Sequence, residues 1–228
     1  MPKVKTLYAE AYYKQYSGLQ EYKYISQYLR STDFDRHFRP ENFYPPPGEP
    51  VPPEHSYFLT GSGQTLGIDI FASLKTKVYI NWLSYTLSKS MQQFDAINGG
   101  DEIPSLTDQR HQVSFSNLFT TGKWNFGAVV LFSKGRPYIA SPMSHILPIT
   151  REYRRLPNFF RTDLSANYNF FIQSLRVKTG ISVINLFNRQ NYFDVNTRTF
   201  NFDNTTFSET NLIQSQRLSL NVFLHISF

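Results

Sequence analysis

Apolar residues occupy every second position in several segments of this sequence, and that alternation limits the folds that the chain can adopt. Between residues 66 and 74, the alternating apolar residues are Leu66, Ile68, Ile70, Ala72 and Leu74. A period of two places them on one face of an extended strand, whereas a helix would distribute them around its axis. Residues 218–228 follow the same pattern up to the terminal Phe228. Both segments therefore predict β-strands with one apolar face and one polar face.

The alternating segments come in pairs that short polar turns connect. Residues 75–77, 121–123 and 172–174 each separate two such segments, and turns of this length join antiparallel neighbours. The expected strands, nine in all, span about residues 6–16, 19–29, 66–74, 78–88, 111–120, 124–132, 161–170, 175–187 and 213–228. The sequence therefore predicts an all-β, antiparallel protein.

Long polar connections separate these hairpins, at about residues 30–62, 90–109, 134–158 and 188–212. A regular alternation of short turns and long loops is typical of outer-membrane β-barrels, whose short turns face the periplasm. The mean hydropathy of −0.39 agrees with such strands, because lipid-facing and lumen-facing residues alternate and their contributions cancel. We therefore expect a transmembrane β-barrel rather than membrane-spanning helices.

Aromatic residues are unusually frequent, with 21 Phe, 15 Tyr and 2 Trp making up 17% of the chain. Such residues suit pleated sheets and the boundary between water and lipid. Trp82, Tyr85, Trp124 and Tyr168 lie near the ends of expected strands, so we predict that they form interfacial aromatic belts.

Several function classes find no support in the sequence. The chain has no Cys, and its five His residues lack metal-binding spacing, so we expect no metal and no cofactor. The net charge of +6 comes from Lys and Arg residues that are scattered singly, which argues against nucleic acid as a partner. His111 and Ser114 would lie on opposite faces of one strand, so we expect no hydrolytic triad and no enzyme.

Five motifs in order resemble the C-terminal part of TonB-dependent outer-membrane receptors, especially the type common in Bacteroidetes. They are Trp-Leu-Ser-Tyr-Thr-Leu-Ser-Lys-Ser at 82–90, Asp-Gln-Arg-His at 108–111, Gly-Arg-Pro-Tyr at 135–138, Arg-Leu-Pro at 155–157 before Arg-Thr-Asp-Leu-Ser-Ala at 161–166, and Ile-Asn-Leu-Phe-Asn at 184–188. Their order and spacing match this family across most of residues 60–228, and the terminal Phe228 agrees with it.

The resemblance implies a 22-stranded barrel, filled by an N-terminal plug, that imports siderophores, cobalamin or glycans with energy from the TonB complex. Residues 1–228 would then form one unit, the C-terminal barrel fragment of such a receptor in the outer membrane of a Gram-negative cell. Nine strands is an odd number, and residues 1–5 lack the apolar segment of an export signal, so we expect the plug and the N-terminal strands to be missing. The expected partners are outer-membrane lipid, the barrel-assembly machinery, the TonB complex through the missing plug, and the imported small molecule or glycan.

Candidate site residues follow from this interpretation. Substrate contacts are expected in the long loops, at Phe43, Tyr44, Arg136 and Tyr138. Loop-anchoring and lumen-facing charges are expected at Asp108, Arg110, His111, Arg161 and Asp163, with Arg161 and Asp163 in a ladder paired across strands. The expected assembly signal in the last strand consists of Val222, Leu224, Ile226 and Phe228, because the resemblance implies that the assembly machinery recognises such a strand.

Two other interpretations remain open from the sequence alone. A complete small porin-like barrel would need an even number of strands and pairing of residues 1–16 with residues 213–228. A soluble antiparallel β-sandwich with a binding function would turn its apolar faces inward.

Overall fold

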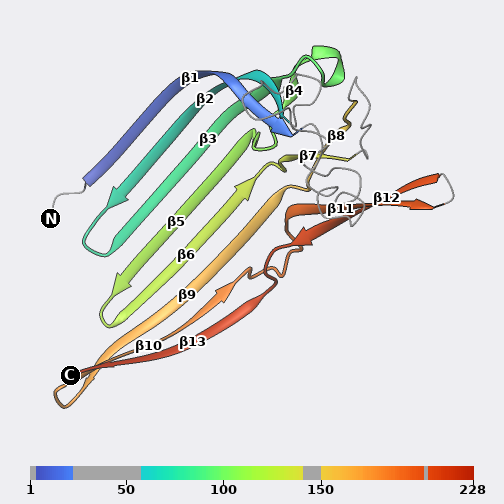
Figure 1. The fold of residues 1–228 in the computed structure, drawn as a ribbon. Coiled ribbons are helices and arrows are strands. Elements are labelled where there is room, and N and C mark those ends of the chain that lie inside the picture. The colour runs from blue at the N-terminus through green and yellow to red at the C-terminus, as the bar shows by residue number, and fades with distance from the viewer. Residues whose placement is uncertain (1–3, 23–57, 141–149, 203–204) are drawn as a thin grey trace, which may run out of the picture.

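The computed structural model describes residues 4–22, 58–140, 150–202 and 205–228. The chain is all-β, and its main sheet contains eight long strands in the order β1-β2-β3-β5-β6-β9-β10-β13, all antiparallel to their neighbours (Figure 1). These strands are β1 (Val4–Tyr22), β2 (Phe58–Lys75), β3 (Tyr79–Gln93), β5 (His111–Thr121), β6 (Trp124–Ser133), β9 (Phe159–Ile172), β10 (Leu175–Ile184) and β13 (Ser219–Ser227).

Shorter elements lie within the long connections. The two-residue strand β4 (Ile103–Pro104) pairs with β3, and a single 3-10 turn spans Asn98–Gly100. Two separate hairpins pair β7 (Pro137–Ile139) with β8 (Tyr153–Arg155) and β11 (Tyr192–Phe202) with β12 (Thr205–Gln214). No helical element of the described residues is long and apolar enough to cross a membrane.

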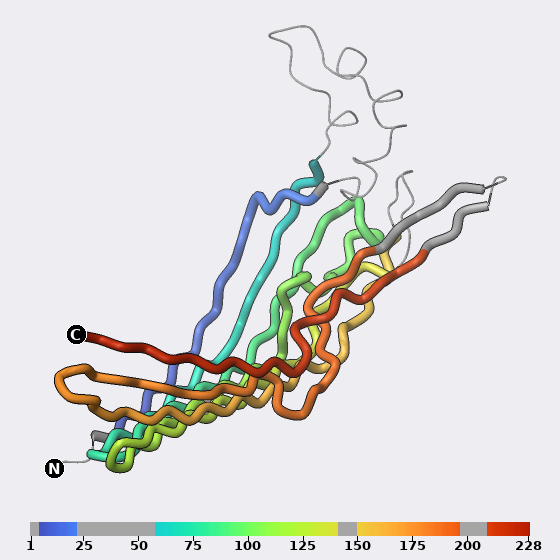
Figure 2. Tube along the Cα trace, turned by 90° about the horizontal axis from the view of Figure 1, so that it is seen from below, coloured from blue at the N-terminus to red at the C-terminus, as the bar shows by residue number. Residues whose placement is uncertain are grey.

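The two ends of the main sheet differ. The turns β2–β3, β5–β6 and β9–β10 lie at one end, which we call the turn end, and β1 begins and β13 ends there (Figure 1). The described parts of the long connections lie at the opposite end, the loop end (Figure 1). The sheet also twists, so that its edge strands β1 and β13 run in different directions in Figure 2. The expected alternation of short turns and long connections is therefore present along the described strands.

The strand register sorts side chains onto two faces, because residues that are opposite each other in a ladder point the same way. One continuous row contains Ala9, Ile70, Tyr85, Val113, Phe132 and Phe160. The apolar face carries the odd-numbered residues of β1 (up to Ser17), β3, β5 and β10 and the even-numbered residues of β2, β6, β9 and β13. Beyond the bulge in β1, Gln20 and Tyr22 lie opposite Thr60 and Phe58 and so also belong to the apolar face. The remaining residues of these strands form the polar face.

The apolar face is the more exposed one on β2. Leu66, Ile68 and Ile70 are 48%, 45% and 38% exposed, whereas Asp69 and Phe71 of the polar face are only partly exposed. Among the described residues, five hydrophobic side chains are buried, and four of them lie in the connections at the loop end. A small core there consists of Phe94, Ile97 and Ile103. Burial of apolar surface therefore holds the loop end together, while the apolar face of the sheet is uncovered by the described residues.

The expected number of strands was wrong at the N-terminus. Residues 6–16 and the start of the expected strand 19–29 form the single strand β1, and the rest of that segment lies outside the described residues. The register shifts by one residue between Ser17 and Leu19, and Gly18 has a φ of +68°. Glycine adopts this conformation without a Cβ clash, so the chain bulges and continues instead of reversing. Within the described residues, the sheet thus has eight long strands where the sequence predicted nine.

The boundaries of two other regions also needed correction. Strand β2 begins at Phe58, eight residues before the first apolar residue of its alternating segment. The connections at 134–158 and 188–212 contain the hairpins β7–β8 and β11–β12 rather than irregular loops alone. These short or polar strands lack the apolar alternation on which the sequence-based assignment rested.

Candidate functional site

Asp108 is the centre of a charge cluster at the loop end. Its side chain is fully buried, and its Oδ1 accepts a hydrogen bond of 2.9 Å from the backbone N–H of Ser90. Its Oδ2 accepts hydrogen bonds from Arg110 Nε at 3.2 Å and from the guanidinium of Arg155. Arg155 also donates to the backbone oxygens of Asp108 and Gly135, at 2.9 and 3.0 Å. One carboxylate therefore joins β3, the start of β5 and β8.

The surroundings of Asp108 determine its ionisation. Burial by itself raises the pKa of this carboxyl, but the hydrogen bonds from Arg155, the Ser90 N–H and Arg110 favour the charged form and outweigh that effect. The pKa of Asp108 is consequently below its ordinary value of 3.8. The cluster remains charged at neutral and mildly acidic pH.

His111 directly follows this cluster in the sequence, and its side chain lies on the apolar face of the sheet. Its Nδ1 lies 2.9 Å from the hydroxyl of Tyr85, and the two rings stack with their centroids 6.2 Å apart. Arg110 turns towards Asp108 instead. Ser114 lies on the polar face, opposite Ser84 in the register, so His111 and Ser114 are on different faces of β5.

Arg161 and Asp163 lie on the polar face of β9, and their side chains form an ion pair of 3.0 Å along the same strand. The expectation of a ladder across strands was wrong, because their partners on β6 are the apolar residues Leu131 and Val129. Asp163 Oδ1 also accepts a hydrogen bond of 2.9 Å from the backbone N–H of Asn185. This ion pair therefore also supports the end of β10.

The candidate substrate contacts separate into two groups. Arg136 forms an ion pair of 2.8 Å with Asp194 and borders a hollow of about 250 Å³ at the loop end, which Lys134 and Tyr192 also border. Tyr138 lies opposite Arg154 in the β7–β8 hairpin. Phe43 and Tyr44 lie outside the described residues.

Asparagine side chains hold the loop end in a way that the sequence did not reveal. Asn98 accepts a hydrogen bond of 2.7 Å from the backbone N–H of Arg151 and donates one of 3.0 Å to its carbonyl. Asn191 binds both backbone groups of Phe160 in the same manner, at 2.9 and 2.8 Å. Each side-chain amide thereby makes the two hydrogen bonds that the backbone of a neighbouring strand would otherwise make to that residue. Asn residues are frequent in loops, so no spacing in the sequence distinguishes these two.

Asn185, in the fifth motif, is a third such residue. It is 1% exposed and has a φ of +56°. Its Nδ2 donates to the backbone oxygens of Arg189 and Gln216, at 2.8 and 3.1 Å. The side chain thus ties the end of β10 to the segment that leads into β13.

A second charge pair, between the buried Arg151 and the partly exposed Glu21, lies at the loop end near β1. The side chain of Arg151 is 1% exposed, and its guanidinium lies 3.1 Å from Glu21 Oε1. Tyr153 packs against the small core, and burial raises its pKa although Arg151 opposes that effect. Sequence reasoning missed this pair because its members are 130 residues apart in the chain.

A row of aromatic rings crosses the apolar face close to the turn end. The rings stack or tilt against one another with centroid separations from 4.7 to 6.4 Å. The row consists of Phe119, Phe126, Trp124, Tyr168 and Phe170. Trp124 and Tyr168 therefore lie together near the turns, as an aromatic belt requires. Trp82 does not belong to this row, because it lies on the polar face of β3, where it is opposite Ser73 and Ser116.

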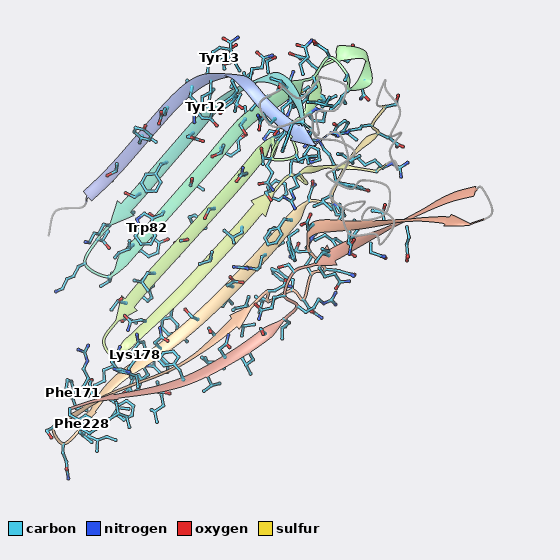
Figure 3. All side chains as sticks on the ribbon, in the orientation of Figure 1. Tyr12, Tyr13, Trp82, Phe171, Lys178 and Phe228 are labelled. Carbon is cyan, nitrogen blue, oxygen red and sulfur yellow. The ribbon has the colours of Figure 1, made fainter. Side chains whose placement is uncertain are left out.

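The last strand presents its apolar residues to the outside. Leu220, Val222, Leu224 and Ile226 are 59%, 72%, 65% and 46% exposed, and Phe228 is fully exposed. Phe228 lies at the turn end (Figure 3). Among the described residues, β13 pairs only with β10, so its other edge is open.

Comparisons with known proteins do not assign this chain to a family. No protein-family profile, curated protein or solved structure matches the chain. Within the described ranges, no group of three or more His, Cys, Asp or Glu residues is placed to hold a metal ion.

Proposed function

We propose that this chain forms part of the wall of an outer-membrane β-barrel, in a TonB-dependent receptor that imports a scarce nutrient. The observation that carries the proposal is the apolar face, which extends over all eight long strands and is uncovered by the described residues. In water such a surface would be unfavourable by roughly 25 cal/mol for each Å² of apolar area, whereas hydrocarbon stabilises it. A β-sandwich would instead bury this face against a second sheet.

Two further features support a membrane location. The aromatic row at the turn end lies where side chains with an apolar body and a polar edge would meet the lipid headgroups. The polar face carries Asp69, Arg161 and Asp163, which suits a hydrated lumen. In this arrangement the short turns face the periplasm, and the fixed loop end with Asp108 and Arg136 faces outward.

The two tryptophans provide a direct test, because they lie on opposite faces of the sheet. Trp82 belongs to the polar face and Trp124 to the apolar face. The full-length protein is reconstituted into vesicles, and the fluorescence of each tryptophan is obtained as the difference between the parent and its Trp→Phe variant. Brominated phospholipid should quench Trp124 and spare Trp82, while iodide in the water should quench Trp82 and spare Trp124. Equal lipid quenching of both residues would contradict the proposal.

Import itself requires a cellular measurement. Cells that express the full-length protein should take up radiolabelled cobalamin, a ferric siderophore or a labelled glycan faster than cells that lack it. Dissipation of the proton-motive force should abolish the difference, because the resemblance implies TonB-driven transport. Uptake that is independent of energy would point to a porin instead.

The porin-like alternative gains support from one observation. The main sheet has eight long strands, an even number that is sufficient for a small barrel. Within the described residues, β1 and β13 do not pair with each other, which weighs against closure of these strands alone. Cysteines introduced in pairs on β1 and β13 separate the two cases: disulfide formation in the membrane-inserted protein would indicate a closed eight-stranded barrel.

A further inference from the structure

The polar face contains a hollow of about 260 Å³ on strands β3, β5 and β6 that the proposed function does not yet use. The residues that border it on this face include Ser84, Gln112, Ser114, Leu131, Ser133 and Phe159. The hollow thus presents hydroxyl and amide groups together with two apolar side chains, Leu131 and Phe159. A concave site with a few convergent polar groups is the usual form of a small-ligand site.

Much of the hydrogen-bonding capacity in this hollow is free. Within the described part of the chain, the side chains of Ser84, Ser114 and Gln112 have no protein partner. By contrast, the neighbouring Thr86 donates to Asp69 Oδ1 at 2.6 Å. The three free groups include donors and acceptors, so they match a ligand that carries hydroxyl groups.

Trp82 adds an aromatic surface directly beside the hollow. It lies on the same face as Ser84, two residues along β3, a separation of about 7 Å. The residues opposite it, Ser73 and Ser116, are small, and Trp82 is 48% exposed. The electron-rich face of an indole attracts the slightly positive C–H groups on one side of a sugar ring. An exposed tryptophan next to free hydroxyls therefore favours a carbohydrate.

The charges around the hollow select against an anionic ligand. The three rows of the polar face that contain Thr86, Ser84 and Trp82 carry three acidic residues, Glu10, Asp69 and Asp163. Arg161 is the one basic residue in the described part of these rows, and Asp163 neutralises it at 3.0 Å. An anionic iron chelate would meet net negative charge here, whereas a neutral sugar would not.

We infer that Trp82 and the adjacent hollow bind a neutral oligosaccharide, with one sugar ring on the indole and the next hydrogen-bonded to Ser84, Ser114 and Gln112. The inference rests on the proposed function, in which the polar face lines the lumen. Under that proposal the site would lie on the path of the imported ligand, and the transported nutrient would be a glycan.

The test uses the Trp82 fluorescence of the full-length protein in vesicles, again taken as the difference between the parent and Trp82→Phe. Maltohexaose, cellohexaose and isomaltohexaose serve as probes, with iron(III) citrate as the anionic comparison. At millimolar concentration at least one of the sugars should reduce iodide quenching of Trp82 twofold or more. Iron citrate should not protect Trp82, and no sugar should alter the quenching of Trp124.

Variants of the hollow identify the groups that bind. Replacing Ser84→Ala and Ser114→Ala together should raise the sugar concentration for half-maximal protection, by roughly two- to tenfold for each lost hydrogen bond. Ser182→Ala is the matched control, because Ser182 lies on the polar face of β10, away from the hollow. It should leave the protection unchanged.

The outcomes distinguish this inference from the proposed function. If brominated lipid quenches Trp82, the polar face does not line a lumen, and the membrane proposal itself fails. If lipid and iodide separate the two tryptophans as expected but no sugar protects Trp82, the glycan inference alone is overturned. Protection that survives in the Ser84→Ala, Ser114→Ala variant at the original sugar concentration would also overturn it.

Discussion

At the scale of single residues, polar side chains that are buried, such as Asp108 and Asn191, or partly buried, such as Asn98, organise the loop end. Asp108 accepts three hydrogen bonds through its carboxylate, and Asn98 and Asn191 each bind both backbone groups of a distant residue. Buried polar groups are costly when unpaired, so each of these side chains stabilises only the arrangement that pairs it fully. The long connections are therefore held in defined positions with little apolar burial.

Replacing Asp108→Asn should loosen this end of the sheet. The change leaves Arg110 and Arg155 without their carboxylate, but both side chains are more than one third exposed, so water offsets part of the loss. We expect a local cost of about 2 kcal/mol, equivalent to roughly 30-fold faster hydrogen exchange in residues 90–110. Asp101→Asn, an exposed residue in the same connection, is the control and should have no effect. Equal exchange in Asp108→Asn and the parent would contradict this role.

The stabilisation by Asp108 should also depend on pH. Its pKa is lowered in the folded protein, so the stabilisation is present above the ordinary value of 3.8 and is lost as the pH falls through the lower folded value. The exchange difference between the parent and Asp108→Asn, corrected for intrinsic rates, should persist from pH 7 to about pH 4. It should disappear at more acidic pH. A difference that disappears already near pH 6 would indicate that another group is responsible.

At the scale of elements, the β7–β8 hairpin depends on a close approach between two backbone segments. A Cβ on Gly135 would meet the carbonyl group of Leu156, which is backbone and cannot move aside. The Leu156 N–H donates to the carbonyl of Arg136 at 3.0 Å, and Arg155 donates to the carbonyl of Gly135. The Gly-Arg-Pro-Tyr motif at 135–138 thus begins with a glycine at a position where only a glycine fits.

Gly135→Ala should therefore separate β8 from the segment before β7. We expect hydrogen exchange across residues 135–140 and 150–156 to rise at least tenfold, while the central strands remain protected. Gly122→Ala is a useful comparison, because Gly122 has a φ of +55° with open space around it. Its effect should stay within the β5–β6 turn, at about 1 kcal/mol. Unchanged protection of the hairpin in Gly135→Ala would show that the approach is not required.

At the scale of the whole molecule, the two edge strands of the described sheet carry unpaired backbone N–H and C=O groups. The described strands leave one edge of β1 and one edge of β13 unpaired, and unpaired strand edges are not tolerated in lipid. On our proposal, other strands of the barrel cover both edges. Strand β13 would then be the site where closure is completed, with its exposed apolar residues against lipid.

Deleting Phe228 should impair barrel assembly in the full-length protein. Phe228 ends the alternating apolar series at the turn end, where its ring would enter the lipid boundary. Ser227→Ala, on the polar face, is the control, since its hydroxyl makes only a long contact of 3.5 Å with the Arg176 carbonyl. Heat-modifiable mobility of outer-membrane fractions on a gel measures assembly. Equal folded fractions in the deletion variant and the parent would remove this support for the membrane proposal.

The sequence by itself determined the positions of the long strands from β2 onward, their two faces and the short turns. Alternation has a period of two and turn signals are local, so the residues of β2 and the β5–β6 turn carry the information without help from distant segments. Only the tertiary structure decided three other features. Two expected strands merge at Gly18, Trp82 lies on the polar face, and a charge cluster forms around Asp108. Asp108 and Arg155 are 47 residues apart, and register across several strands brings them together. Such contacts depend on the fold as a whole, because no local pattern records which side chains a given register will place side by side.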